Sequence, residues 1–104
     1  MLGQDQMEEK KSIAVLPFVN ISNDIDNEYF SDGITEEIIS ALTNIKELKV
    51  IARTSSFAFK GKSIDVRKVG EQLNVATILE DSVRKFNNRV RISAQLIDVL
   101  YFTY

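Results

Sequence analysis

The sequence contains no cysteine, no histidine and no tryptophan. Without cysteine there are no disulfides, no thiol redox chemistry and no Cys/His zinc sites. Without histidine or cysteine there are no catalytic triads built on either residue. Carboxylates, lysine, tyrosine, serine and threonine are the groups left for acid–base or nucleophilic chemistry.

Long hydrophobic runs and glycine-rich loops are also missing. The longest apolar run, residues 13–19, has seven residues and includes Pro17, so it is too short to span a bilayer. Residues 1–11 are polar and lack the apolar centre of a signal peptide. We therefore expect a cytoplasmic chain, or a piece of a longer polypeptide. Gly61 and Gly70 lack P-loop spacing, so we expect neither nucleotide nor cofactor.

With 104 residues there is room for one domain, which we place at 12–100, between a polar leader (1–11) and an apolar tail (101–104). The charge is uneven along the chain. Residues 1–45 hold nine acids and two bases (−7), and residues 46–104 hold six acids and eleven bases (+5). This asymmetry is typical either of charge-guided contact with a partner or of two solvated surfaces.

The first half of the chain predicts a parallel βαβ unit. Residues 13–18 form an apolar strand with Pro17 at its end, residues 27–44 a helix, and residues 48–52 a second strand. The apolar stripe of the helix is spaced to face the sheet. It consists of Phe30, Ile34, Ile38, Ala41, Leu42 and Ile45.

The second half predicts a helix and a hairpin. Residues 55–60 suit a single helical turn, and residues 65–73 form a helix on which Gly70 allows close packing. Residues 75–85 and 89–99 form a β-hairpin. Its second strand alternates apolar and polar residues, so we expect one face to be covered. The fold class is α/β, with two helices on a mixed sheet of about four strands.

Six polar residues follow the first two predicted strands. Parallel strands end at one edge of a sheet, where open α/β folds bind ligands. The predicted cleft consists of Asn20, Ser22, Asn23, Arg53, Thr54 and Ser55. It could hold an anion or a peptide carboxylate. Alternatively, Arg53 pairs with the Asp/Glu cluster at the start of the first helix, while Thr54 and Ser55 cap a short helix.

Acidic residues are spaced as in the start of a calcium loop at Asp24, Asp26 and Glu28. Such a loop needs glycine at its sixth position and glutamate at its twelfth, where this chain has Tyr29 and Thr35. Acids at a helix N-terminus, favoured by the helix dipole, explain the cluster better. We expect no metal site.

Two further charge clusters carry little chemistry. Adjacent carboxylates occur at positions 36–37 and 80–81, but neighbouring side chains diverge in helices and strands, so we expect no catalysis. A basic cluster flanks the hairpin turn at Arg84, Lys85, Arg89 and Arg91. It has little aromatic interleaving in the sequence, so we do not expect nucleic acid to bind.

Three segments carry a resemblance to a known family: residues 12–22, 27–38 and 51–57. Together they resemble the TolB N-terminal-like domain, in the form found in bacterial adenylate-cyclase-like and TPR-containing signalling proteins. The resemblance implies a non-catalytic protein-interaction or regulatory module of a signalling or envelope-associated assembly. The alternative is a small-ligand or anion sensor that uses the predicted cleft.

The chain departs from that family pattern at two places. Asp81 replaces a glycine, which predicts strain or a displaced bulge. An apolar tail replaces the turn after Val99, which predicts a homodimer formed through an open sheet edge or by exchange of the tail. Alternatively, the tail folds back over its own core. The predicted self-association edge consists of Leu100, Tyr101, Phe102 and Tyr104.

Overall fold

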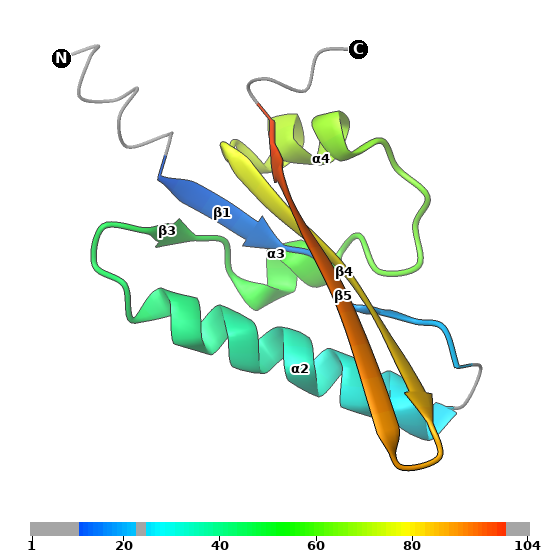
Figure 1. The fold of residues 1–104 in the computed structure, drawn as a ribbon. Helices are drawn as coiled ribbons and strands as arrows, with labels where there is room; N and C mark the ends of the chain where they lie inside the picture. The colour runs from blue at the N-terminus through cyan, green and yellow to red at the C-terminus, as the bar shows by residue number, and fades with distance from the viewer. Residues whose placement is uncertain (1–10, 23–24, 100–104) are drawn as a thin grey trace, which may run out of the picture.

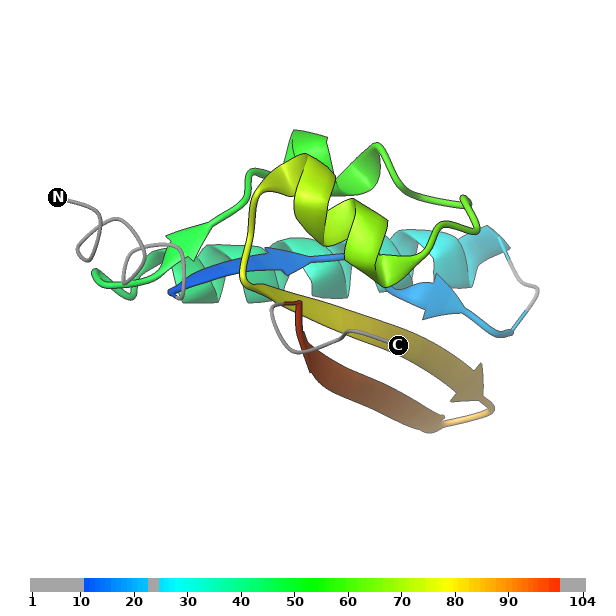
Figure 2. The ribbon, with the colours of Figure 1, turned by 90° about the horizontal axis from the view of Figure 1, so that it is seen from above.

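The fold is a mostly parallel five-stranded sheet with helices on both faces. The computed structural model describes residues 11–22 and 25–99. Helix α2 lies along one face of the sheet and α4 lies on the other (Figure 1, Figure 2). No helix in these two ranges is long and apolar enough to cross a membrane. The elements in chain order are β1 (Ser12–Val15), β2 (Val19–Asn20), α2 (Ile25–Thr43), β3 (Lys49–Val50), α3 (Arg53–Phe57), α4 (Val66–Leu73), β4 (Thr77–Phe86) and β5 (Arg89–Asp98).

Strands β1 and β2 lie end to end along β4, both parallel to it, while β3 pairs with the other side of β1. Pro17 lies in the gap between β1 and β2 and has no N–H to donate to the ladder. The N–H of Phe18 donates instead to Thr35 Oγ1 on α2, at 2.9 Å. The predicted end of the strand near Pro17 is therefore confirmed. The first strand ends at Val15, and β2, a short strand that was not predicted, follows the proline.

The predicted βαβ unit and hairpin are both present. Strands β1 and β3 are parallel and are connected through α2. Strands β4 and β5 pair antiparallel without interruption from Thr77 and Asp98 to a turn at Asn87 and Asn88. Asn87 has φ 55, a conformation that asparagine tolerates better than most residues. Three helices, rather than two, pack around this sheet. The third is α3, which takes the place of the single helical turn predicted at 55–60 and begins earlier, at Arg53.

The face that α2 presents to the sheet is more polar than predicted. Asn27, Ser31, Thr35 and Ile39 are buried and recur every four residues. The Ser31 and Thr35 hydroxyls donate to the backbone carbonyls of Asn27 and Ser31, at 2.7 and 3.1 Å. These bonds satisfy the hydroxyls inside the helix, so the buried face can contain small polar residues.

The predicted apolar stripe is therefore only partly correct. Ile34, Ile38 and Leu42 are half-buried, whereas Ala41 and Ile45 are exposed. The buried row at every fourth residue drifts around the helix relative to the apolar stripe. Small hydroxyl residues occupy the closest positions over the sheet, and the larger apolar residues lie beside them.

A cluster of the hydrophobic core lies on the α4 side and is made of Ala14, Val69, Val75 and Ile78. The Asp65 carboxylate caps α4 by accepting the N–H of Arg67 at 2.9 Å, and Asn74 ends the helix with φ 55. Gly70 packs against Val99, where an added Cβ would lie 2.7 Å from both Val99 methyl carbons. The close approach predicted at Gly70 is confirmed.

Candidate interaction site

Strand β5 is the least covered element of the sheet. Within the described residues it pairs with β4 alone, so its other edge is open. Figure 2 shows β5 as the outermost strand, beyond both α2 and α4. All of its residues except Ile97 are exposed. The site is therefore an uncovered strand at the rim of the domain.

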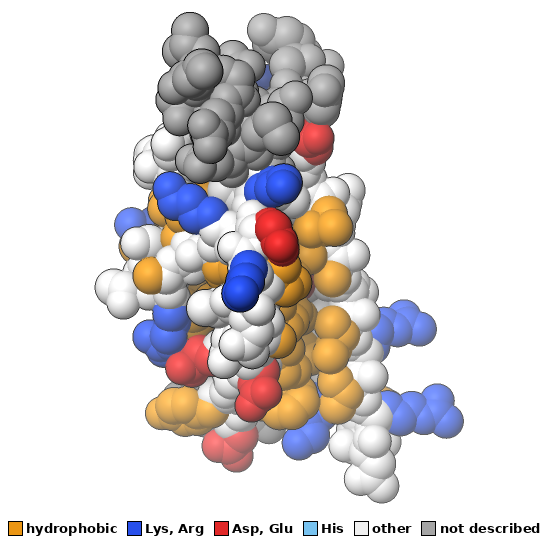
Figure 3. Space-filling model, turned by 90° about the vertical axis from the view of Figure 1, so that its left-hand side faces the viewer, with side chains coloured by type: hydrophobic (Ala, Val, Ile, Leu, Met, Phe, Trp, Pro, Cys, Tyr) orange, Lys and Arg blue, Asp and Glu red, His pale blue; other side chains and the backbone are white. Residues whose placement is uncertain are grey.

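An apolar row runs along one face of β5. Val90, Ile92 and Leu96 are 44%, 51% and 65% exposed, and Ala94 between them is exposed as well. The expectation that this face is covered is wrong for the described part of the chain. The reason is geometric, because α2 contacts β1, β2, β3 and β4, whereas β5 lies beyond it at the rim of the sheet (Figure 2). Figure 3 shows hydrophobic side chains in a strip down one side of the molecule, with basic side chains on its flank.

Three arginines occupy the opposite face of the hairpin, near its turn. Arg84 lies directly opposite Arg91 in the register, and Arg89 follows on the same face. Like charges directly opposite in a sheet are destabilising. None of the three forms an ion pair with another described residue. An anionic group on this face would relieve the repulsion.

Aromatic residues from two elements gather near the same turn. Phe86 is 69% exposed at the end of β4. Lys85 Nζ lies 5.5 Å from the ring centroid of Phe30, which places the hairpin beside the start of α2, where Tyr29 is 75% exposed. Exposed aromatics with arginines are typical of protein interfaces. Sequence reasoning missed Tyr29 and Phe30 because they are far from the hairpin along the chain.

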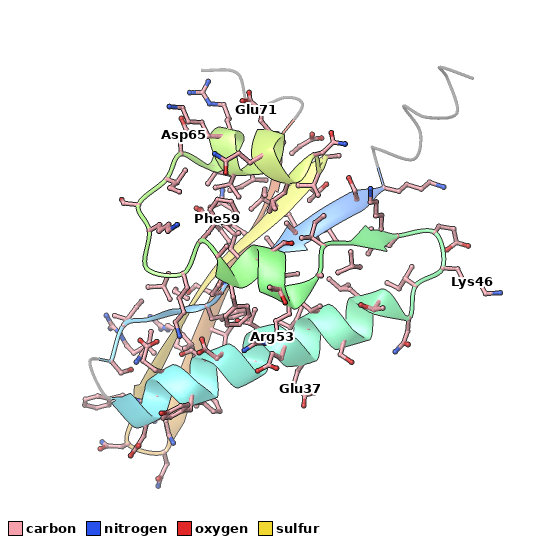
Figure 4. All side chains as sticks on the ribbon, turned by 180° about the vertical axis from the view of Figure 1, so that it is seen from behind. Glu37, Lys46, Arg53, Phe59, Asp65 and Glu71 are labelled. Carbon is pink, nitrogen blue, oxygen red and sulfur yellow. The ribbon has the colours of Figure 1, made fainter. Side chains whose placement is uncertain are left out.

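The predicted cleft at the carboxyl edge is divided between separate contacts. Arg53 Nε lies 3.0 Å from Glu36 Oε1, and its guanidinium carbon lies 4.2 Å from the centre of the Phe57 ring (Figure 4). Ser22 Oγ accepts the N–H of Lys85 at 2.8 Å and so joins the hairpin instead. The alternative prediction is partly correct: Arg53 pairs with an acid, but with Glu36 along α2 rather than with the acidic cluster at the start of that helix.

The remaining cleft residues are also separated. Asn20 pairs with Val83 of β4, whereas Val50, just before Arg53, lies at the level of Thr77 of β4. These two β4 positions are six residues apart, about 20 Å along the strand. Thr54 and Ser55 are exposed on α3. The N-cap of α3 is Ala52, which makes no side-chain cap, so capping by Thr54 and Ser55 is wrong. Asn23 lies outside the described residues. A ligand-binding role for this group stays a prediction.

A groove of about 820 Å³ lies between three segments: residues 16–20, residues 59–64, and the middle of the hairpin. Its walls are mainly apolar, and Lys60 and Glu80 are among its charged residues. Lys60 Nζ lies 2.6 Å from Asp32 Oδ2 and 3.2 Å from Glu28 Oε2. The hydrogen bond to Asp32 raises the pKa of Lys60. This ammonium ties the loop after α3 to α2.

Asp81 is a buried acid in the middle of the hairpin. It is 8% exposed, and both carboxylate oxygens lack a hydrogen-bond partner among the described residues. Burial, and secondarily the charge of Glu80, raise the pKa of Asp81 to about 8. It pairs with Ala94 in an unbroken ladder, so no bulge forms here. The side chain is largely neutral at pH 7, which suits its place in the same row as Leu79 and Val83.

Comparison with known proteins identifies relatives of the sequence. A model of the HilA/YgeH-like transcriptional regulator, second domain, matches residues 9–101. The chain is 57% identical over 93 residues to a Rhizobium meliloti protein named putative adenylate cyclase 3. The match covers 89% of this chain and 16% of that protein. The expected relation to adenylate-cyclase-like proteins is thus supported, while the TolB N-terminal-like resemblance is not confirmed.

Solved structures share the fold at low sequence identity. The lipoprotein GNA1162 from Neisseria meningitidis aligns with a TM-score of 0.67 and 18% identity, over 88% of this chain and 71% of that one. The LpoB C-terminal domain from Escherichia coli aligns with a TM-score of 0.62 and 21% identity, over 96% of this chain and 80% of that one. These likenesses show the architecture alone.

Proposed function

We propose that this chain is a non-catalytic regulatory module that binds a protein partner. The premise is that the chain belongs to the family of the second domain of HilA/YgeH-like transcriptional regulators. The assembly it serves is a bacterial signalling or envelope-associated one. The observation that carries the proposal is the apolar row of β5, where Val90, Ile92 and Leu96 are 44–65% exposed. A contiguous uncovered apolar row is typical of an interaction site.

The relatives support a regulatory role without defining it. The Rhizobium meliloti protein carries a signalling name, and the chain spans 16% of its length. Most of that protein therefore lies outside the part that matches this chain. The activity in its name is therefore not attributed to this chain. Lack of histidine and cysteine further favours binding over catalysis.

The interaction is tested by placing a charge in the apolar row. Ile92→Lys should remove specific partners recovered from the source cell with the tagged protein. Ile45→Lys is the matched control, because Ile45 is 45% exposed and Ile92 is 51% exposed, yet Ile45 follows the far end of α2. Partners that are lost from both variants, or from neither, would contradict the proposal.

A small-ligand sensor is the second candidate function, and the groove supports it. Its volume of about 820 Å³ falls within the size range of ligand pockets. A ligand that binds only the folded state raises the melting temperature. Melting curves against a metabolite panel separate the two functions, since a pure interaction module responds to none of them.

Self-association is a finer proposal about the partner. The predicted edge, Leu100, Tyr101, Phe102 and Tyr104, lies outside the described residues. The open edge of β5 supports the idea of strand pairing between copies.

A further inference from the structure

We propose that β5 binds an extended, acidic segment of a partner protein as an additional strand of the sheet. The inference rests on the proposed function and names the chemistry of the partner. Three features of the hairpin support it: the backbone groups on its open edge, the apolar row on one face, and the arginines on the other.

The open edge presents a regular set of backbone groups. The N–H of Val99 donates to the carbonyl of Ala76 at 2.8 Å, so Val99 points its backbone toward β4. In an antiparallel pair this direction alternates from residue to residue. The N–H and C=O groups of Val90, Ile92, Ala94 and Leu96 therefore point away from β4. An extended segment can bond to all of them in one register.

The residues with outward backbone groups are the same ones that form the apolar row. Exposed side chains of Val90, Ile92 and Leu96 would flank a new strand along its length. Cross-strand neighbours of similar polarity stabilise a sheet by side-chain contact. A bound segment should therefore carry apolar residues at every second position, on the face that continues this row.

The opposite face selects the charge of the segment. Its intervening side chains would lie beside Arg89 and Arg91, and Arg84 stands opposite Arg91 on β4. Carboxylates at these positions would be the first ion-pair partners of the three arginines among the described residues. A second β5 related by a two-fold axis would itself bring further arginines to this face, and Glu80, the acid of its hairpin on that face, would lie one strand further away on β4. The charges thus favour an acidic partner over a second copy.

The backbone contact is tested with a peptide that alternates valine with glutamate over the length of β5. We expect it to shift the amide NMR signals of β5. Ala94→Pro removes one outward N–H and no ladder bond, so the domain should fold. The same substitution should weaken peptide binding by about tenfold or more, as expected when a strand cannot pair. Ala94→Val is the matched control and should keep the affinity.

The charge preference is tested with a second peptide in which lysine replaces every glutamate. The wild-type protein should bind only the acidic peptide, and less tightly at high salt. Arg91→Glu, at an exposed position, should weaken the preference for the acidic peptide, because Arg84 and Arg89 remain on this face. A third peptide with the same composition but grouped valines should not bind, because its apolar side chains would not lie on one face.

Several results would overturn the proposal. The acidic and basic peptides could bind equally well, the Ala94→Pro variant could bind the acidic peptide as tightly as the wild type, or no peptide could bind. A stable dimer that the acidic peptide does not dissociate would make a second copy the occupant. If peptides fail while Ile92→Lys still loses its partners, the proposed function stands and only the extended acidic segment is wrong.

Discussion

At the scale of single residues, Asp81 makes folding depend on pH. Burial raises its pKa from 3.8 to about 8. Between these values the folded state keeps a proton that the unfolded chain has released, so the free energy of unfolding falls as pH rises from about 4 to about 8. Above about 8 both states are ionised and this decline ends. A carboxyl that is neutral at low pH is thus tolerated beside apolar neighbours.

Replacing Asp81 by asparagine should remove this pH dependence. Asp81→Asn keeps the shape and cannot ionise, so its urea midpoint should stay level from pH 5 to pH 8 while that of wild type falls. At pH 8 the variant should be more stable, by on the order of a few kcal/mol, since each pKa unit corresponds to about 1.4 kcal/mol. Parallel declines in the two proteins would contradict the assignment.

Two glycines should respond oppositely to the same substitution. Gly33 lies inside α2 with nothing within 4 Å of an added Cβ, so no packing contact requires glycine there. Gly33→Ala should stabilise the domain by about 0.5–1 kcal/mol. Gly70→Ala places a Cβ 2.7 Å from Val99 and should destabilise it by about 1–3 kcal/mol. Thermal unfolding of both variants checks the pair, and effects of the same sign would be inconsistent with this packing.

At the scale of elements, one exposed ion pair joins α3 to α2. The Arg53 and Glu36 side chains are about half exposed, so the pair should contribute about 0.2–1 kcal/mol. Arg53→Ala should lower the free energy of unfolding by about this amount, plus a small loss of contact with the Phe57 ring. A double-mutant cycle with Glu36→Ala isolates the pair. A coupling energy near zero in low salt would show that the two side chains act independently.

Element types could be predicted from periodicity, but the partners of each face could not. Alternation and turn residues located the hairpin, and Pro17 marked the end of the first strand. The buried face of α2 was missed because the hydroxyls of Ser31 and Thr35 bond within the helix. No sequence pattern reveals that local satisfaction. The predicted cleft is divided because the register of β2 on β4 separates Asn20 from Arg53, and that register depends on contacts distant in sequence.

At the scale of the whole molecule, the open edge of β5 predicts weak self-association. Two copies can pair their β5 strands antiparallel about a two-fold axis and continue the apolar row. Arg89 and Arg91 of both copies then lie in one joint face, while Glu80 of each copy stays one strand away on β4. This local repulsion opposes the dimer, so self-association should strengthen as salt screens it. Binding of the acidic peptide should weaken with salt, because attraction is screened in the same way.

Light scattering over a concentration and salt series checks this prediction. The average mass should rise above that of the monomer only at high protein concentration, and more so at high salt. Leu96→Lys places a charge in the apolar row, where Leu96 is 65% exposed, and should keep the protein monomeric. A chain ending at Val99 separates the strand from the tail: loss of self-association in that chain assigns it to residues 100–104, and retention assigns it to β5. A dimer that weakens with salt would show that attraction between charges, rather than the apolar row, holds the two copies together.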